Sequence, residues 1–382
     1  MKIGIITIHN SPNYGACLQA YALYKYISNH GHEVEIINLL RPTHLGYIAS
    51  NRFRPFRTLQ KSAYKMIISR LKSLIINKKK NNNTSPLSKE SQIKFEQFNS
   101  SIKLSRTFRS IDDLYANPPK YDLYITGSDQ VWNPSQSYCI EPYFLSFVPN
   151  DKIKISYASS IGISKLSENE KNFFKEKLAS YKAISVREYT AKHLLEEIMN
   201  RQITQVADPT FLLSYEHWKS LSNNSKYTYT NYIFLFTLTF DKNLFDYATK
   251  LSNEEGKSLI FLCANRVPND CKAYCTLIED AGPCDFLKLI ENANLVLTNS
   301  FHCTIFSIIM QTHNFYTYIP EGNQRGSRIT DLLSTFSLSS HIITNFNTSF
   351  LDLQLNTIDK ESVAEIYNNE QKKSIDFLSK FI

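Results

Sequence analysis

The sequence predicts an α/β protein with two domains, each built on a mostly parallel β-sheet and facing the other across a cleft. In both halves of the chain, short apolar runs alternate with amphipathic segments of helical period, and such alternation normally produces parallel sheets with right-handed crossovers. A chain of 382 residues is also longer than one core usually covers. We expect one domain over residues 1–205 and a second over residues 206–382, with Asp208-Pro209 close to the change.

The N-terminal half begins with a βαβ unit. A β-rich apolar run at Lys2–His9 is followed by a helical pattern at Ala16–Asn29 and another apolar run at Val34–Leu39. Gly31 ends the helix between them. Farther along we expect strands at Leu123–Ile125, Pro142–Pro149, Lys154–Ser160 and Ala183–Arg187, a helix at Ser167–Leu178 that opens with a Ser167/Glu170 capping box, and a helix from Glu188.

The C-terminal half repeats the alternation. Its expected strands are Tyr232–Leu238, Ser258–Leu262, Leu295–Leu297 and Asn314–Tyr318, and its expected helices are Lys242–Glu254, Pro283–Asn292, Thr304–Met310 and Asp359–Phe381. The last of these helices is long enough to brace the two domains against each other.

Positive charge is concentrated in an insertion of the first domain, residues 41–110. Between Arg52 and Arg109 there are fifteen lysines and arginines but only two acids. Lys61–Ile76 reads as an amphipathic helix with a basic face, which can lie on an anionic membrane surface or pack on the protein with that face solvated. Nucleic acid is not an expected partner, because no recognition motif accompanies the charge.

The sequence carries no sign of export, of a membrane span or of a metal site. The first ten residues lack a long apolar segment with a cleavage site, and no apolar run approaches the roughly 20 residues of a span. The seven cysteines are expected to be reduced thiols, and the spacing of those between Cys263 and Cys284 fits no standard zinc site. We therefore expect a cytoplasmic protein without a bound metal. It is either free in the cytoplasm or bound peripherally to the inner face of the membrane.

Small polar residues follow two of the expected strands. The run that ends at Ile125 leads into Gly127-Ser128-Asp129-Gln130 and then Asn133, and the first strand leads into Asn10 and then Asn13-Tyr14-Gly15. The carboxyl ends of parallel strands meet at one edge of a sheet, which is where open α/β sheets bind ligands. These segments fit either ordinary turns with helix caps or the lining of a binding cleft.

Five further residues place charge, an imidazole or a hydroxyl at turns. Arg187 ends a predicted strand, where its planar guanidinium suits a carboxylate, a phosphate or a salt bridge between domains. Ser300 and His302 lie at a strand-to-helix turn, where the helix dipole favours an anion and histidine can donate a proton, although a buried structural histidine fits the same place. Arg325 and Arg328 flank Gly326 in a loop that suits a phosphate clamp or a solvated basic surface.

These motifs resemble those of the polysaccharide pyruvyl transferase family, in the expected order over residues 1–335. The matching segments are Asn13–Leu23, Tyr121–Asn133, Ile184–Glu188, Asp208–Thr210 and Ala281–His302. The resemblance implies two Rossmann-like domains in a GT-B-like arrangement. It also implies transfer of pyruvate from phosphoenolpyruvate onto two hydroxyls of a sugar as a cyclic ketal, with no cofactor. The implied acceptor is a galactose-type residue of a lipid-linked capsular or cell-surface oligosaccharide.

The resemblance also suggests roles for the candidate residues. We place the donor side in the second domain, and the expected phosphoenolpyruvate ligands are Arg187, which reaches it from the first domain, and Ser300, His302, Arg325 and Arg328 of the second domain. On the acceptor side, which we place in the first domain, the expected cleft residues are Asn10, Tyr14, Gly15, Ser128, Gln130 and Asn133. Asp129 is the candidate base for the sugar hydroxyls, and His302 is the candidate acid for the donor.

Two positions depart from the family pattern. Cys303 stands where a Ser-Phe-His-Gly motif has glycine, and Ser300 stands where other branches have the arginine of Arg-Leu-His. We expect Arg325 or Arg328 to supply the missing charge. Two other classes fit the same sequence: a GT-B glycosyltransferase that uses a sugar nucleotide, and a non-catalytic capsule-assembly scaffold that binds an anionic lipid or a membrane enzyme through the basic insertion.

Overall fold

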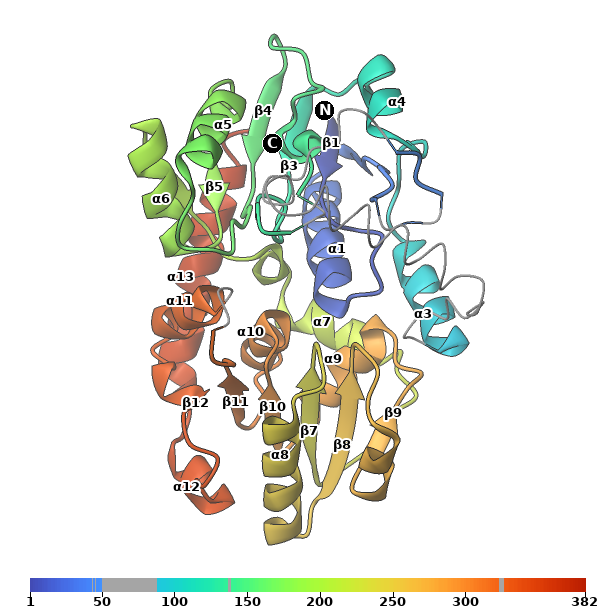
Figure 1. Cartoon of the computed structure of the whole chain (residues 1–382), viewed down its shortest axis with the longest axis vertical. Helices are drawn as coiled ribbons and strands as arrows, with labels where there is room; N and C mark the ends of the chain where they lie inside the picture. Colours follow the sequence, from blue (N-terminus) through green and yellow to red (C-terminus); the bar gives the residue numbers. More distant parts are fainter. Residues whose placement is uncertain (43, 45, 50–87, 137–138, 323–325) are drawn as a thin grey trace, which may run out of the picture.

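The predicted fold class is confirmed: two sheets lie one above the other, and all strand pairs described are parallel (Figure 1). The structure is a computed structural model, and it describes residues 1–42, 44, 46–49, 88–136, 139–322 and 326–382. The helix expected at residues 61–76, most of the basic insertion and Arg325 lie outside the described residues.

The N-terminal sheet has the strand order β2-β1-β3-β4, and the short pair β5-β6 continues it beside β4 through bridges from Ile155 to Ala183 and from Ser159 to Val186. The strands are β1 (Lys2–Ile6), β2 (Glu33–Ile36), β3 (Leu123–Thr126), β4 (Ile153–Ser156), β5 (Ser185–Val186) and β6 (Thr204–Gln205). The helical elements are α1 (Tyr14–Asn29), α3 (Lys89–Asn99), α4 (Ile111–Ala116), η1 (Glu141–Phe144), α5 (Glu168–Leu178) and α6 (Tyr189–Met199).

The C-terminal sheet has the order β12-β11-β10-β7-β8-β9. Its strands are β7 (Tyr232–Thr237), β8 (Ser258–Cys263), β9 (Thr276–Ile278), β10 (Leu295–Thr298), β11 (Phe315–Tyr318) and β12 (Ile342–Ile343). The helical elements of this half are η2 (Pro209–Leu212), α7 (Tyr215–Ser222), α8 (Lys242–Glu255), η3 (Asn269–Ala273), α9 (Pro283–Glu291), α10 (Phe301–Ile309), α11 (Ser327–Thr335), η4 (Ser339–His341), α12 (Phe350–Leu355) and α13 (Lys360–Leu378). The chain passes between the sheets after β6, and the domain boundary at residues 205 and 206 stays a prediction.

Local sequence signals explain where the helices begin. The predicted capping box of α5 is confirmed, with Ser167 accepting from the Glu170 backbone and Glu170 accepting from the Ser167 backbone. The Asn13 side chain accepts from Ala16 N at 3.0 Å and so starts α1 two residues earlier than its apolar pattern indicates. Ser300 caps α10 in the same way through Cys303 N, so α10 begins at Phe301 rather than at Thr304.

One expected strand is wrong. The segment Pro142–Pro149 begins within the 3₁₀ helix η1, which ends at Phe144. The backbone then takes a left-handed conformation at Leu145, whose φ is 51°. Pro142 cannot donate to a strand ladder, and the aromatic side chains pack into a core instead, with the rings of Phe144 and Trp132 stacked 5.6 Å apart. The alternation of apolar residues there therefore reflects aromatic packing rather than a pleated strand.

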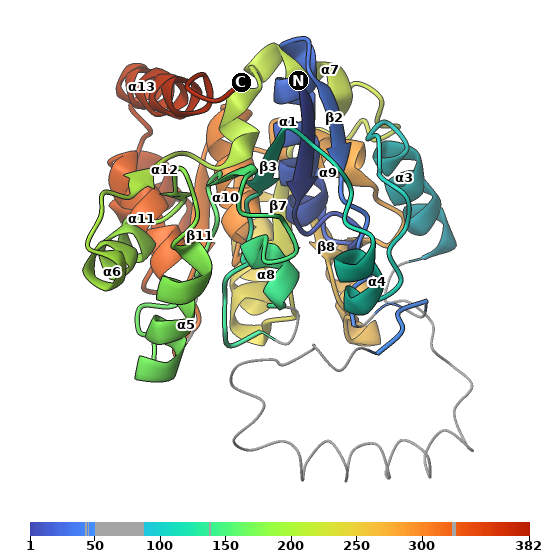
Figure 2. The same ribbon diagram turned by 90° about the horizontal axis from the view of Figure 1, so that it is seen from above.

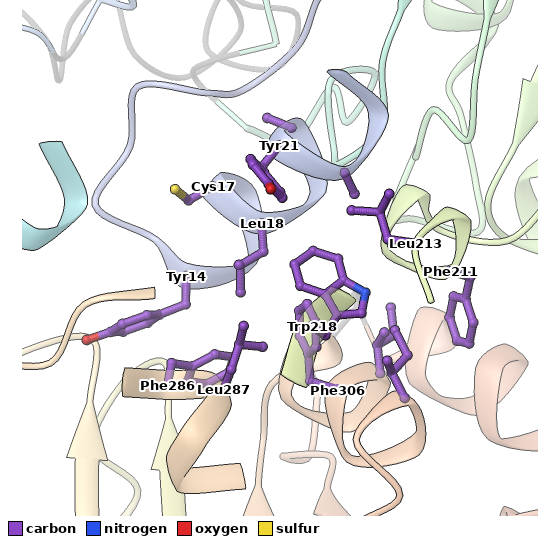
Figure 3. Close-up of a cluster of buried hydrophobic side chains, with 14 of the residues drawn as sticks. Tyr14, Cys17, Leu18, Tyr21, Phe211, Leu213, Trp218, Phe286, Leu287 and Phe306 are labelled. Atoms are coloured by element: carbon purple, nitrogen blue, oxygen red, sulfur yellow. The ribbon is translucent and has the colours of Figure 1, made fainter. Parts of the chain in front are cut away.

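A continuous apolar core joins the two sheets. Side chains of α1 pack against side chains of α7, α9 and α10, as Figure 3 shows for Leu18, Trp218 and Phe306. The Tyr14 ring stacks on Phe286 with centroids 4.9 Å apart, and Trp218 meets Phe306 edge-on at 5.0 Å. Aromatic pairs of this kind add to the energy of burial, so the core holds the two sheets in one relative position.

The C-terminal helix α13 lies alongside both halves of the molecule (Figures 1 and 2). Ser374 Oγ accepts from Ala207 N at 2.9 Å, and Gln371 donates to Phe211 O at 2.7 Å. These bonds tie α13 to the segment through which the chain crosses between the sheets. None of the helices in the described ranges is both long and apolar enough to span a bilayer.

Candidate active site

The carboxyl ends of strands from both sheets meet at Asp208, which follows β6. Its side chain is almost wholly buried, and its Oδ2 atom accepts from Arg187 Nη1 at 2.6 Å and from Ser128 Oγ at 3.3 Å. His302 Nε2, which comes from the other sheet, lies 3.6 Å from the same oxygen, just beyond hydrogen-bond distance. Oδ1 accepts from the backbone and hydroxyl of Thr210 at 3.1 and 2.9 Å.

The charge of Asp208 is strongly stabilised. Burial alone would raise the pKa of Asp208, but the His302 imidazole and the Arg187 guanidinium outweigh burial and hold the pKa well below its usual range. The carboxylate is therefore ionised throughout the physiological range. It binds the arginine that follows β5 and lies 3.6 Å from the histidine of α10, so a single anion is shared by the two sides of the site.

Arg187 has unused hydrogen-bonding capacity. Its guanidinium is buried, with Nε 3.4 Å from Glu188 Oε1 and Nη2 4.0 Å from Asp129 Oδ1. Burial opposes its charge, but Asp208, Glu188 and Asp129 outweigh burial and raise the pKa of Arg187. Nη2 has no hydrogen-bond partner in the part of the chain that the structure describes. A donor left in this state is suited to a ligand anion.

Phe301 separates two guanidiniums. The Arg187 Cζ atom lies 4.3 Å from the centre of its ring, and the Arg328 Cζ atom lies 5.2 Å from it. Cations favour the faces of aromatic rings, so Phe301 brings two positive groups together without a direct contact between them. Arg328 thus joins the site through Phe301.

Glu188 is a second buried carboxylate beside Arg187. Its Oε1 atom accepts from the Ser160 hydroxyl as well as from Arg187 Nε. Burial raises the pKa of Glu188, and the charges of Arg187 and Arg328 and the bond from Ser160 oppose this only in part. The two neighbouring carboxylates therefore differ, because the surroundings of Asp208 lower its pKa and those of Glu188 raise its pKa.

His302 is wedged between the two sheets. A Cβ atom added at Gly15, in the first turn of α1, would lie only 2.1 Å from His302 Nδ1. Glycine is therefore required at this position for the imidazole to reach Asp208. His302 itself is 7% exposed, and its Nε2 atom faces Asp208. The two groups that limit its position lie against the N-terminal sheet, Gly15 in α1 and Asp208 in the segment just after β6.

Asp129 lies in the left-handed region of backbone conformation, with φ 65°. Its carbonyl accepts from Val131 N at 2.8 Å and from Ser160 N at 3.0 Å, so the turn is held at both sides. Aspartate tolerates this conformation better than most residues. The turn directs the carboxylate toward Arg187, with its side chain 15% exposed.

The structure brings together Ser128, Asp129, Arg187, His302 and, through Phe301, Arg328. It places other expected site residues differently. Tyr14 lies in the core between the sheets and donates to Ala281 O at 3.0 Å. Gln130 and Asn133 are bonded to each other at 2.7 Å beneath Gly162, and the Ser300 hydroxyl caps α10. Their expected roles in binding stay predictions.

Sequence reasoning missed Asp208, Glu188, Ser160 and Phe301 as site residues. Each follows or adjoins the end of a strand, which is the signal that identified Asp129 and Arg187. Asp208 was noted only as the residue before a proline near the domain change and as the start of the Asp208–Thr210 segment that matches the family, without a role in the site. No group of three or more His, Cys, Asp or Glu residues is placed to hold a metal in the described ranges. Burial raises the pKa of Cys303 to about 12, so this thiol, next to His302, is not a ready nucleophile.

Comparison with solved structures gives the class of fold. The chain is similar to UDP-N-acetylglucosamine 2-epimerase from Rickettsia bellii, with a TM-score of 0.56 and 12% identity over 99% of this chain and 95% of that one. It is similar to UDP-GlcNAc 2-epimerase from Methanocaldococcus jannaschii in complex with UDP-GlcNAc and UDP, with a TM-score of 0.51 and 13% identity over 100% of both chains. The protein therefore has the GT-B type of fold, and at these identities the likeness extends to the fold alone.

The family follows from the sequence itself. The model of the polysaccharide pyruvyl transferase family matches residues 13–317, which is most of the chain. The protein belongs to this family, and the predicted resemblance is confirmed. No curated protein sequence matches the chain.

Proposed function

We propose that the protein transfers pyruvate from phosphoenolpyruvate onto two hydroxyls of a sugar, forming a cyclic ketal. The observation that supports this proposal most directly is the meeting of Asp129, Arg187 and His302 around the Asp208 carboxylate, with contributions from both sheets. A two-sided site of this kind suits a reaction with two substrates, a small anionic donor and a neutral sugar.

The donor carries a carboxylate and a phosphate, and the site offers several receptors for them. Arg187 Nη2 is a buried donor that the described residues leave unpaired. The first turn of α10, capped by Ser300, provides backbone N–H groups and the positive end of a helix dipole. Arg328 adds a second guanidinium beside the Phe301 ring, and we propose Arg325 for the same role. Because Asp208 already balances much of the charge of Arg187, the helix start and Arg328 carry a large part of the phosphate binding.

The reaction needs an acid at the methylene carbon and a base at the sugar. Protonation of the methylene carbon makes C2 of the donor electrophilic, and His302 is our candidate for this proton. The first sugar hydroxyl then forms a C–O bond to C2 and loses its proton to Asp129. Phosphate leaves C2 with the electrons of the C–O bond, and the second hydroxyl forms the second C–O bond to C2 and passes its proton to the departing phosphate, closing the ketal. The sugar gains the elements of pyruvate minus water, and inorganic phosphate is released.

Other parts of the proposal concern the acceptor and its location. We propose that the acceptor is a galactose-type residue of a lipid-linked capsular or cell-surface oligosaccharide. Asn10 and Ser128 lie at the sheet edge beside Asp129, on the side where we place this acceptor. We also propose that the basic segment 52–109 brings the protein to the inner face of an anionic membrane, and most of that segment lies outside the described residues.

The proposal is tested by incubating the purified protein with phosphoenolpyruvate and galactose-terminated acceptors. We expect phosphate release together with a product heavier by pyruvate minus water. Asp129→Asn and His302→Ala should reduce transfer by roughly 10²-fold or more, while Asp151→Asn and His313→Ala, which change exposed residues of the same types, should leave it unchanged. A shift of the melting temperature by UDP- or CMP-sugars but not by phosphoenolpyruvate would instead favour a glycosyltransferase.

A further inference from the structure

We propose that Arg41 and Asn10 form a subsite for an oxyanion, a phosphate or carboxylate group carried by the sugar acceptor next to the residue that is modified. The inference rests on the proposed function and specifies the chemical class of its acceptor. Asn10 and Arg41 lie equally far beyond Ile5 and Ile36, which are paired in the adjacent parallel strands β1 and β2. The two residues therefore leave the sheet at the same edge as the Asp129 turn, Asn10 one strand away from that turn and Arg41 two strands away.

Both residues present donors that the fold leaves unused. Asn10 Nδ2 and Arg41 Nε are shielded from solvent and have no hydrogen-bond partner among the residues that the structure describes. A buried donor without a partner is costly, and more so in a charged group. Two such donors on neighbouring loops are best explained by a ligand that accepts from both.

The nearest titratable groups do not neutralise Arg41. His9 lies with Nδ1 3.1 Å from Thr7 O and Nε2 3.2 Å from Asn38 Oδ1. Burial lowers the pKa of His9, and the charge of Arg41 lowers it further, against the effect of those two bonds. His9 is therefore neutral at pH 7, and Arg41 is a lasting positive charge that faces no carboxylate at ion-pair distance in the described ranges.

The subsite is electrostatically linked to the proposed base. Burial raises the pKa of Tyr143 to about 12, with the charge of Arg41 acting to lower it and that of Asp129 acting to raise it. Both charges thus act on the same hydroxyl, so the proposed subsite and the Asp129 turn both lie within electrostatic range of Tyr143. A sugar whose hydroxyls approach Asp129 can extend its neighbouring charged group toward Arg41.

The loop that carries Asn10 is rigid. Gln19, from α1, donates to Ile8 O at 3.1 Å and to Ala16 O at 2.9 Å, and the Thr7 hydroxyl donates to Ser128 O at 3.0 Å. These bonds join the loop to both α1 and β3. The backbone that leads to Asn10 is therefore held up to Ile8, which limits the entropy lost when a ligand binds there.

Steady-state kinetics with three acceptors test the subsite. The acceptors are octyl β-galactoside, which is neutral, octyl galactosyl phosphate, and a glucuronosyl galactoside, with phosphoenolpyruvate saturating. We expect the preferred charged acceptor to have a KM roughly tenfold or more below that of the neutral one, and Arg41→Gln to remove this preference while kcat changes by less than about twofold. Arg41→Lys should keep part of the preference. Arg201→Gln, which removes a charge at the far end of α6, should keep all of it.

The outcomes separate this inference from the proposed function. A preference for the phosphate acceptor identifies the link to a lipid carrier as the source of charge, and a preference for the glucuronosyl acceptor identifies an acidic sugar. Equal KM values for neutral and charged acceptors, or a preference that survives in Arg41→Gln, would overturn the subsite even if transfer occurs. Calorimetric binding of the same acceptors without phosphoenolpyruvate provides a readout without turnover. Binding that depends on Arg41 but no transfer to any acceptor would retain the subsite and reject the pyruvyl transfer.

Discussion

Replacing Asp208 by asparagine tests the electrostatic centre of the molecule. The substitution keeps the size of the side chain but removes a buried negative charge that accepts from Arg187 at 2.6 Å and from Ser128 at 3.3 Å. The amide group can face Arg187 with an oxygen, but the guanidinium then has no opposite charge at that distance. Removing one partner of a buried ion pair costs about 3–5 kcal/mol, because the other charge stays buried. Against a usual total of about 5–15 kcal/mol, such a loss is large.

The effect should depend on pH. The pKa of Asp208 in the folded protein lies well below the value of about 3.9 for an unfolded chain. Its contribution to the free energy of unfolding is therefore fully present above about pH 5 and is lost as pH falls toward the folded pKa. We expect the gap between the wild type and Asp208→Asn to be widest near pH 7 and to narrow as the solution is acidified below pH 4.

Urea denaturation followed by circular dichroism at several pH values measures this gap, with Asp151→Asn as the exposed control. The double variant Arg187→Gln, Asp208→Asn should lose less stability than the sum of the two single variants, because it leaves no unpaired charge in the core. A loss below about 1 kcal/mol at pH 7, or additive single losses, would refute the view that Asp208 and Arg187 form a coupled buried pair.

Two further substitutions examine the neighbours of this pair. Glu188 should affect the pH dependence of the free energy of unfolding in the opposite direction to Asp208. Its raised folded pKa means that the folded state binds the proton more tightly, so its contribution is favourable below about pH 4 and is lost as pH rises through the folded value. Glu188→Gln should remove this contribution. The same urea series should show Glu188→Gln at least as stable as the wild type at pH 8, and a clear loss there would contradict the reasoning. Gly15→Ala should destabilise by roughly 1–3 kcal/mol, because the new methyl group would meet His302 at 2.1 Å. Alanine stabilises a helix relative to glycine. A net gain in stability to urea, or unimpaired transfer, would therefore show that the contact between position 15 and His302 is not tight.

The fold could be predicted because it depends on local patterns. Alternation of apolar runs with amphipathic segments identified most of the long strands and helices, and the capping box at Ser167 fixed the start of α5. Very short strands gave no such signal. Thr204–Gln205 and Ile342–Ile343 are strands only because a longer neighbour offers hydrogen bonds, and η1 was misread because Pro142 and its aromatic neighbours pack as a turn.

The candidate site could be predicted only in part, for a related reason. The ends of strands identified Asp129, Arg187 and His302, because each parallel strand delivers its last residues to one edge. Which side chains then pair depends on contacts between distant parts of the chain. Asp208 meets Ser128 across 80 residues, and the contact of Gly15 with His302 spans the two halves of the chain. No local pattern reports such pairings, so the carboxylate at the centre of the site was not recognised.

The geometry of the site also explains why the two sheets are joined by an apolar core. His302 belongs to α10, but the groups that orient it lie against the N-terminal sheet, Gly15 in α1 and Asp208 in the segment just after β6. The imidazole is therefore aligned only while α10 is docked on α1, and a displacement of about 1 Å is enough to lose much of a catalytic effect. The contact of Tyr14 with Phe286 and those of Trp218 with Tyr21 of α1 and Phe306 of α10 maintain this docking. The apolar contacts between the sheets therefore do more than stabilise the fold, because they also set the alignment of the proposed acid. A substitution that creates a cavity in this core should impair transfer although it changes no residue of the site.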